Sequence, residues 1–157
     1  MFTPIQGDLT AGAFRYGIVA SRFNDVITRR LTDGAIDCLT RHGATPEQIS
    51  VLLCPGSFEI PLVARKMVDS GTFDGIICIG AVIRGATPHF DYIAAEVTKG
   101  IANLAMESRI PIAFGVLTTD TTEQALERAG LKLGNKGWEA AQTVMEMLNL
   151  FAAIDGK

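Results

Sequence analysis

Short apolar runs alternate with longer helical patterns along the whole chain, and this alternation limits the fold more than any other feature. The apolar runs, typical of buried strands, are YGIVAS (16–21), ISVLLC (49–54), GIICIGAVI (75–83) and PIAFGVLTT (111–119). Helical patterns cover Asp25–Arg41, Glu59–Asp69, Pro88–Glu107, Thr122–Ala129 and Lys136–Ala153. Right-handed crossovers place such helices on both faces of a parallel sheet. The sequence therefore predicts an α/β protein, a three-layer α/β/α sandwich with a four-stranded parallel sheet.

Residues that favour helix ends fall at these boundaries. Gly43, Gly71 and Gly130 each follow a predicted helix, where glycine is common because it adopts the left-handed conformation without strain. Thr121, with Gln124 three residues later, is typical of a capping box. We see no linker, repeat or low-complexity segment in the 157 residues, so we expect residues 1–157 to form a single domain.

The charge balance limits the partners. Lys and Arg total 14 against 17 Asp and Glu, so we expect no general attraction to nucleic acid or to an anionic membrane. The longest apolar stretch, Ile76–Ile83, is far shorter than the roughly 20 residues of a membrane-spanning helix. MFTPIQGDLT lacks a basic region followed by an apolar one, so we expect no signal peptide and a cytoplasmic location. The apolar fraction of 48% is high enough to suggest a subunit interface.

The three cysteines indicate neither disulfides nor a metal site. Cys38, Cys54 and Cys78 are odd in number, lack CxxC spacing and lie in apolar runs. We expect buried, reduced thiols.

Unusual residues gather where each predicted strand ends. Ligands of open parallel sheets bind outside the carboxyl ends of the strands, so these segments are the place to search for a site. The four segments are SRFND (21–25), CPGSFEIP (54–61), IGAVIRGATPHF (79–90) and TTDTTEQALERAG (118–130). None contains GxGxxG, GxxxxGK[ST] or GxSxG, and no carboxylates are paired at metal-ligand spacing, which disfavours nucleotide hydrolysis, hydride transfer and serine hydrolysis.

The third segment combines a histidine with a small-residue loop. We expect Thr87 to be the N-cap, Pro88 the first helical residue and His89 part of the first turn. Gly85 and Ala86 leave backbone N–H groups free to meet an anion, assisted by the helix dipole. That dipole also favours a neutral imidazole, which can accept a proton. Spacing alone leaves two roles open: proton transfer beside a phosphate, or a histidine that only caps its helix.

Other strand-end residues also have two interpretations. Glu59 can bind a polyol or compensate the helix dipole, and Phe23 can stack on a flat heterocycle or anchor its loop. Arg128 and Lys136 are either phosphate partners or solvated side chains. By contrast, His42 is expected to be only a C-terminal helix residue.

Six ordered motifs closely resemble those of the lumazine synthase family over essentially the whole chain. They are RFN (22–24), PGSFEIP (55–61), GAVIRGATPHFDY (80–92), AFGVLTTDT (113–121), EQALERAG (123–130) and GNKG (134–137). The resemblance implies a flavodoxin-like sandwich and a transferase of riboflavin biosynthesis. This enzyme condenses 5-amino-6-ribitylamino-2,4(1H,3H)-pyrimidinedione with 3,4-dihydroxy-2-butanone 4-phosphate and releases phosphate and water. The product is 6,7-dimethyl-8-ribityllumazine, and no metal or redox cofactor is implied.

The resemblance also implies roles for individual residues. Phe23 would stack on the pyrimidine, His89 would transfer protons, and Phe114 and Arg128 would enter from a neighbouring subunit, Arg128 to bind phosphate. Other substrate contacts would come from Ser57, Phe58 and Glu59 (ribityl chain), Ala81, Val82 and Ile83 (pyrimidine edge), and Ala86 and Thr87 (phosphate). Further candidates for the site are Asn24, Gly85 and Lys136.

The same resemblance implies a homopentamer that assembles into an icosahedral shell able to enclose riboflavin synthase. Some relatives stop at pentamers and have extra residues between the last two helices, but AGLKLGNKG (129–137) shows no such insertion. Two departures are Ser57, where many members have Ala, and Leu131, where Thr is common. The alternatives are an archaeal-type riboflavin synthase, a non-catalytic flavin-binding shell protein and a phospho-receiver module, the last of which would need clustered Asp residues at strand ends.

Overall fold

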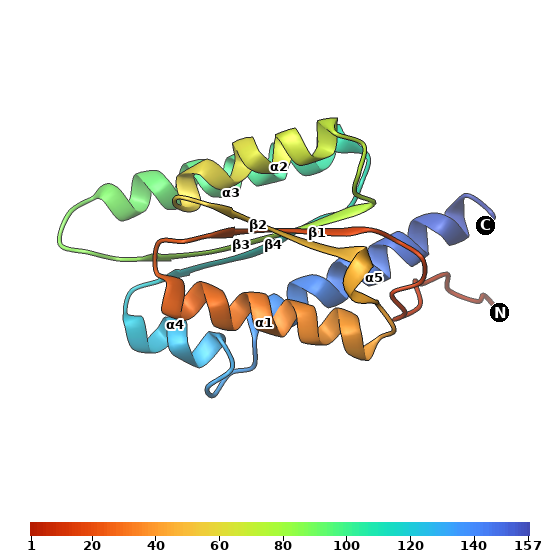
Figure 1. Cartoon of the computed structure of the whole chain (residues 1–157), viewed down its shortest axis with the longest axis horizontal. Helices are drawn as coiled ribbons and strands as arrows, with labels where there is room; N and C mark the ends of the chain where they lie inside the picture. Colours follow the sequence, from red (N-terminus) through yellow and green to blue (C-terminus); the bar gives the residue numbers. More distant parts are fainter.

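A computed structural model describes residues 1–157 and contains one parallel sheet (Figure 1). Its strands are β1 (Tyr16–Ser21), β2 (Ile49–Cys54), β3 (Gly75–Ile83) and β4 (Ile112–Thr119). They are arranged in the order β2-β1-β3-β4, and all three neighbouring pairs are parallel. This order is flavodoxin-like, and its direction reverses between β1 and β3, where such sheets open a crevice for ligands.

Helices cover both faces of the sheet, which confirms the predicted sandwich. They are α1 (Asp25–Arg41), α2 (Ile60–Asp69), α3 (His89–Ser108), α4 (Thr122–Arg128) and α5 (Lys136–Ile154). Figure 1 shows α2 and α3 above the sheet and α1, α4 and α5 below it. Short 3-10 helices span Pro46–Gln48 and Ser57–Glu59. The predicted boundaries of strands and α-helices agree with the structure to within one residue.

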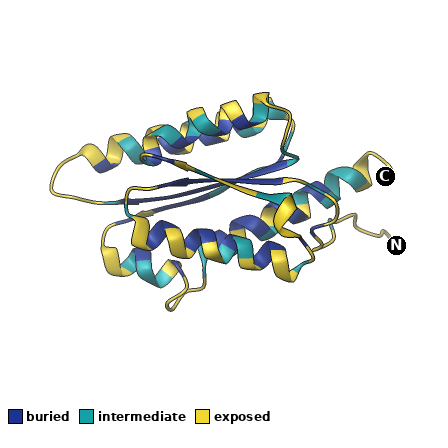
Figure 2. Ribbon diagram, viewed as in Figure 1, coloured by how far each residue is buried: buried dark blue, intermediate teal, exposed yellow.

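The hydrophobic core forms one cluster on each face of the sheet. Successive side chains of a strand point to opposite faces, so Ile18 and Ala20 pack with α1 and α5 while Val19 packs with α2 and α3. Figure 2 shows the central strands buried between the helical layers. Strand β2 lies at the sheet edge, where Val51 and Leu53 stay exposed.

Close packing of α1 against α5 requires glycine. A Cβ added to Gly137 would overlap the carbonyl oxygen of Leu31 in α1. Next to it, the Asn135 side chain accepts a 3.1 Å hydrogen bond from the N–H of Trp138 and donates a 2.9 Å bond to the carbonyl of Arg30. Asn135 therefore caps α5 and attaches its start to α1.

The helix-end predictions are confirmed except at α3. Gly43, Gly71 and Gly130 have φ of 103°, 67° and 103°, in the left-handed region. Thr121 and Gln124 form the expected capping box, with side-chain to backbone bonds of 3.1 and 3.3 Å.

Thr87, however, is not the N-cap of α3. Pro88 occupies that position with φ −70° and ψ 3°, and no side chain caps the helix. The Pro88 carbonyl accepts from the N–H of Asp91 at 3.0 Å, a bond across three residues rather than four, so regular helix begins one residue later, at His89.

All three cysteines are free and buried, as predicted. Burial raises the pKa of the Cys38 thiol to about 11 and that of Cys78 to about 12, because the thiolate would lose its hydration. Burial raises the pKa of Cys54 as well. In addition, no helix of the chain combines the length and apolar content needed to cross a membrane.

Candidate active site

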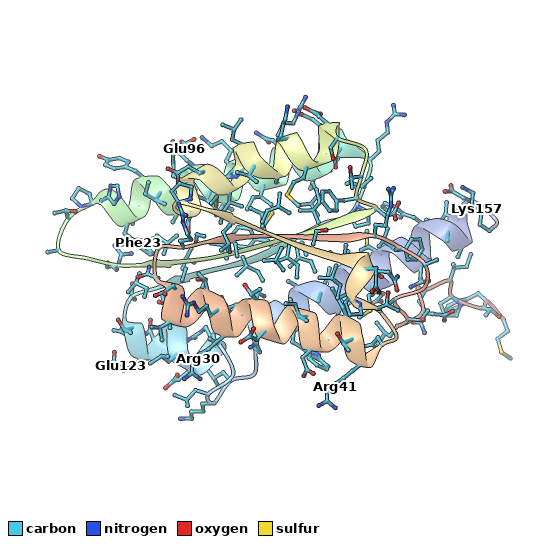
Figure 3. All side chains as sticks on the ribbon, viewed as in Figure 1. Phe23, Arg30, Arg41, Glu96, Glu123 and Lys157 are labelled. Atoms are coloured by element: carbon cyan, nitrogen blue, oxygen red, sulfur yellow. The ribbon has the colours of Figure 1, made fainter.

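A pocket of about 660 Å³ opens at the carboxyl edge of the sheet, where β1, β2 and β3 end. Figure 3 shows Phe23 at this edge, on the left of the view. Eleven of the predicted site residues line the pocket: Phe23, Asn24, Ser57, Phe58, Glu59, Ala81, Val82, Ile83, Gly85, Thr87 and His89. Residues more than 60 positions apart in the sequence therefore converge here, at the point where the strand order reverses.

The turn after β1 presents Phe23 to the pocket. Backbone hydrogen bonds from Arg22 to Cys54 and from Phe23 to Pro55, of 2.8 and 3.1 Å, continue the β1–β2 ladder beyond the strands. Asn24 then adopts a left-handed conformation, φ 63°, and its side-chain amide donates a 2.9 Å hydrogen bond to the carbonyl of Ala81. The backbone is thus held on both sides, while the Phe23 side chain remains 71% exposed beside the pocket.

The segment after β2 forms the next wall of the pocket. Ser57 is buried against β3, and a Cβ added to Gly80 would lie only 2.6 Å from its hydroxyl oxygen. Gly80 therefore provides the space in which Ser57 begins the short 3-10 helix. Phe58 is exposed and Glu59 half-buried, so an aromatic ring and a carboxylate both face the opening.

The loop after β3 offers backbone donors to the pocket. The N–H groups of Gly85, Ala86 and Thr87 form no hydrogen bond within the chain, and all three residues are exposed. Nothing lies within 4 Å of a Cβ built on Gly85, so the backbone is open to a ligand there. Ala86 lies in this loop but not in the pocket lining. Free N–H groups next to a helix start form a favourable environment for a phosphate.

His89 begins α3 and lies beside these donors. It is exposed, and its imidazole forms no hydrogen bond within the chain, so it does not cap its helix in this structure. The other histidine differs: the His42 ring nitrogen lies 2.6 Å from the carbonyl oxygen of Cys38, and its ring packs against Trp138.

Arg84 makes contacts that sequence patterns do not predict. Its guanidinium lies 2.8 Å from the Asp120 carboxylate, 3.3 Å from Asp91 and 4.4 Å from the ring centre of Phe90. The hydrogen bond to Asp120, opposed by a smaller desolvation effect and supported by the charge of Asp91, raises the pKa of the guanidinium above its ordinary value. Asp120 is 36 positions away, which is why spacing gives no signal for this contact.

Three predicted site residues lie elsewhere in the single chain. Phe114, Arg128 and Lys136 line a separate hollow of about 410 Å³ beside β4, the other edge strand. Arg128 is exposed, and its guanidinium donates a 3.0 Å hydrogen bond to the carbonyl of Gln124. One copy of the chain therefore brings these residues together with one another but not with His89.

Four further residues line the main pocket: Pro55, Gly56, Phe90 and Ile93. Pro55, Gly56 and Phe90 lie within the motifs PGSFEIP and GAVIRGATPHFDY, so the sequence contained a signal for their place in the site. Ile93 lies one helical turn before Val97 on α3, and it both packs against the core and lines the pocket.

The chemistry available here combines stacking, anion binding and proton transfer. Phe23 and Phe58 offer rings, the loop after β3 offers N–H donors, and Glu59 and His89 can exchange protons or accept hydrogen bonds. Nowhere in the chain do three or more His, Cys, Asp or Glu side chains gather as metal ligands would.

Comparison with known proteins gives one consistent result. The sequence pattern of the family described as 6,7-dimethyl-8-ribityllumazine synthase matches residues 13–152. A protein of that name from Syntrophus aciditrophicus (strain SB) is 58% identical over 154 residues. This alignment covers 98% of the present chain and all of the relative.

Proposed function

Because the chain belongs to the 6,7-dimethyl-8-ribityllumazine synthase family, we propose that its 660 Å³ pocket is the place where it performs that family's reaction. The chain is a transferase of riboflavin biosynthesis that condenses 5-amino-6-ribitylamino-2,4(1H,3H)-pyrimidinedione with 3,4-dihydroxy-2-butanone 4-phosphate. One observation supports the location above all: an exposed aromatic ring, a carboxylate, a histidine and unbonded backbone donors line a single pocket.

The pyrimidine substrate occupies the side of the pocket formed by β1, β2 and β3. Phe23 stacks on its ring, and the backbone of Ala81, Val82 and Ile83 faces the edge of the pyrimidine. Ribityl hydroxyls extend toward the segment after β2, where they meet Ser57, Phe58 and Glu59. Support comes from the exposure of Phe23 and from the half-buried carboxylate of Glu59, which can accept hydrogen bonds from a polyol.

The butanone phosphate occupies the side formed by the loop after β3. The free N–H groups of Gly85, Ala86 and Thr87 bind its phosphate, and His89 lies beside the reacting carbons. The substrate amine attacks the ketone and water leaves as the imine forms. Phosphate is then eliminated, and the enol that remains tautomerises to a second carbonyl. The ribityl-bearing amine attacks this carbonyl, and a second water leaves as the ring closes. Each step moves a proton, and His89 accepts and returns it close to the leaving phosphate.

A second subunit completes the site. Phe114, Arg128 and Lys136 lie apart from the pocket in one chain, which supports a site that Phe114 and Arg128 enter from a neighbouring subunit. We propose a homopentamer in which Arg128 of each subunit reaches the phosphate bound by the next. Apolar side chains that are exposed on β2, α2 and α3 support a large interface. They are Val51, Leu53, Leu62, Tyr92 and Met106.

The short connection between α4 and α5 supports further assembly of the pentamers. Only residues 129–135 separate these helices, without the insertion associated with isolated pentamers. We propose an icosahedral shell of pentamers that can enclose riboflavin synthase, with residues 1–157 acting as one domain in the cytoplasm and without a metal or redox cofactor.

The experiment that tests the function mixes the purified chain with both substrates and follows lumazine fluorescence. Lumazine formation that requires both substrates is expected. Incubation with lumazine alone tests the alternative of an archaeal-type riboflavin synthase, because riboflavin would then appear. A chain that binds flavin but forms no lumazine would instead be a non-catalytic shell protein.

A further inference from the structure

One arginine, Arg84, connects the two ends of segment 85–89, which contributes three residues to the pocket. The backbone N–H of Arg84 donates a 2.8 Å hydrogen bond to the carbonyl of Thr119, which attaches the start of the loop to the end of β4. Its guanidinium contacts Phe90 and Asp91, the residues just beyond the end of the loop. The backbone and side chain of this one residue therefore hold both ends of the segment that contains Gly85, Thr87 and His89 (green loop at the left of Figure 1).

The carboxylate that orients Arg84 is itself attached to a rigid turn. Asp120 accepts from the guanidinium at 2.8 Å, and its own backbone N–H donates a 2.8 Å hydrogen bond to the Gln124 side chain. Gln124 in turn belongs to the capping box of α4. The contact to Arg84 thus connects the loop after β3 to a turn with several hydrogen bonds.

The loop needs such support because it has little of its own. Gly85, Ala86 and Thr87 form no backbone hydrogen bonds, and Gly85 has the widest choice of backbone conformations. Arg84 does not line the pocket, and its guanidinium is paired with the carboxylates of Asp91 and Asp120. Its planar guanidinium can meet two carboxylates and a ring face at once, whereas a lysine ammonium offers one point charge.

We propose that Arg84 is a positioning residue for the condensation. Through its contacts with Asp120, Asp91 and Phe90 it fixes the loop after β3, so that the backbone donors of that loop and His89 face the same substrate. This inference rests on the proposed function of the pocket. We call the four residues Arg84, Phe90, Asp91 and Asp120 the loop clasp.

The test compares Arg84→Ala and Arg84→Lys with Arg65→Ala. Arg65 forms an exposed ion pair of the same length, 2.8 Å, between α2 and α3, and serves as the matched control. We expect Arg84→Ala to lower kcat by about 10- to 100-fold, because a small misplacement of reacting groups has effects of that size. We expect Arg84→Lys to recover part of this loss, and Arg65→Ala to keep the parent kcat. Parent-level kcat for Arg84→Ala would overturn the proposal.

A second set of variants separates positioning from direct contact with substrate. If Arg84 acts through the clasp, Asp120→Asn also lowers kcat, and the double variant Arg84→Ala/Asp120→Asn is little worse than Arg84→Ala. If Arg84 instead binds phosphate directly, Arg84→Ala raises the KM for the butanone phosphate at constant kcat, and Asp120→Asn does not impair turnover. That second pattern would overturn the proposal.

Amide hydrogen exchange tests the clasp without any turnover. We expect the hydrogen-bonded N–H groups at the two ends of the loop, those of residue 84 (to Thr119) and Asp91 (to Pro88), to exchange faster in Arg84→Ala than in the parent, with the strands unchanged. Unchanged exchange would overturn the clasp even if lumazine forms normally. Conversely, if these amides exchange faster in Arg84→Ala than in the parent but the parent makes no lumazine, the clasp stands and only the proposed function is refuted.

Discussion

The side-chain amide of Asn24 donates a 2.9 Å hydrogen bond to the backbone carbonyl of Ala81, and this bond joins the end of β1 to the end of β3. It crosses the point where the strand order reverses. Asn24 also has φ 63°, a conformation that asparagine tolerates better than most residues. One residue therefore holds together two walls of the pocket.

Replacing Asn24 by Ala should lower the free energy of unfolding by about 2 kcal/mol, because both the hydrogen bond and the tolerance for positive φ are lost. Asn24→Gly is the matched control, since glycine keeps the backbone conformation and loses only the hydrogen bond. We expect a loss of about 1 kcal/mol for Asn24→Gly in urea unfolding. Equal losses for the two variants would contradict the strain argument.

The two histidines should respond oppositely to substitution. His89→Ala is expected to slow condensation by roughly one to four powers of ten while the unfolding midpoint stays unchanged, because the imidazole forms no hydrogen bond within the chain and can act as a proton carrier. His42→Ala is the control: it should lower stability by about 1 kcal/mol, through loss of the bond to Cys38, at parent turnover. Fluorescence assays and thermal melts measure both. A stability loss alone for His89→Ala would return that residue to a structural role.

Loss of the Arg128 guanidinium should act on one substrate. We expect Arg128→Ala to weaken use of the butanone phosphate about 10- to 100-fold, the size of a charge-assisted contact, and to leave pyrimidine binding nearly unchanged. Arg41→Ala, another exposed helical arginine, is the control for loss of charge. Titrating each substrate separately gives the answer. Equal losses for both substrates would argue against a phosphate contact.

Burial of the thiols should make the protein lose stability at alkaline pH. The pKa values of Cys38 and Cys78 are raised to about 11 and about 12, so the folded chain keeps these protons at a pH where unfolded thiols release them. The stabilisation that the buried, protonated thiols contribute is complete below the ordinary thiol pKa near 9. It is lost as the pH rises toward 11–12. Each thiol contributes at most about 1.4 kcal/mol per pH unit.

Urea unfolding from pH 8 to about 11 measures this slope. Cys78→Ala should lower stability at neutral pH because it leaves a small cavity, yet flatten the alkaline loss relative to the parent. Tyrosine and lysine also titrate in this range, so the comparison between parent and variant isolates the thiol. Identical slopes would show that Cys78 does not stay protonated on folding.

Strands and pocket walls could be predicted because both follow from local rules. Runs such as 75–83 are apolar throughout because helices cover both sides of the strand, and ligands gather at the carboxyl ends of such strands. Thr87 was wrongly predicted as a cap, because whether Pro88 joins the helix depends on a backbone turn that composition does not determine. The contact of Arg84 with Asp120 could not be predicted, since it depends on two strand ends being neighbours. Spacing also could not show that Phe114 and Arg128 lie outside the pocket of their own chain.

The proposed assembly has a direct test in solution. Light scattering or native mass spectrometry of the unmodified protein should give a pentamer or a multiple of pentamers at micromolar concentration. A pentamer that assembles no further would contradict only the shell. A monomer would contradict both the shell and the shared site.

Mixing two inactive variants tests whether neighbouring subunits share the site. His89→Ala and Arg128→Ala chains are unfolded together in equal amounts and refolded. If the site is shared, it takes His89 from one subunit and Arg128 from the adjacent one. Random mixing then gives about a quarter of the sites an intact His89 and an intact Arg128, so the mixture should regain about a quarter of the parent activity. Each variant refolded alone is the control and should stay at its own low rate. If both residues act within one chain, every chain in the mixture lacks one of them, and activity cannot exceed the mean of the two variants.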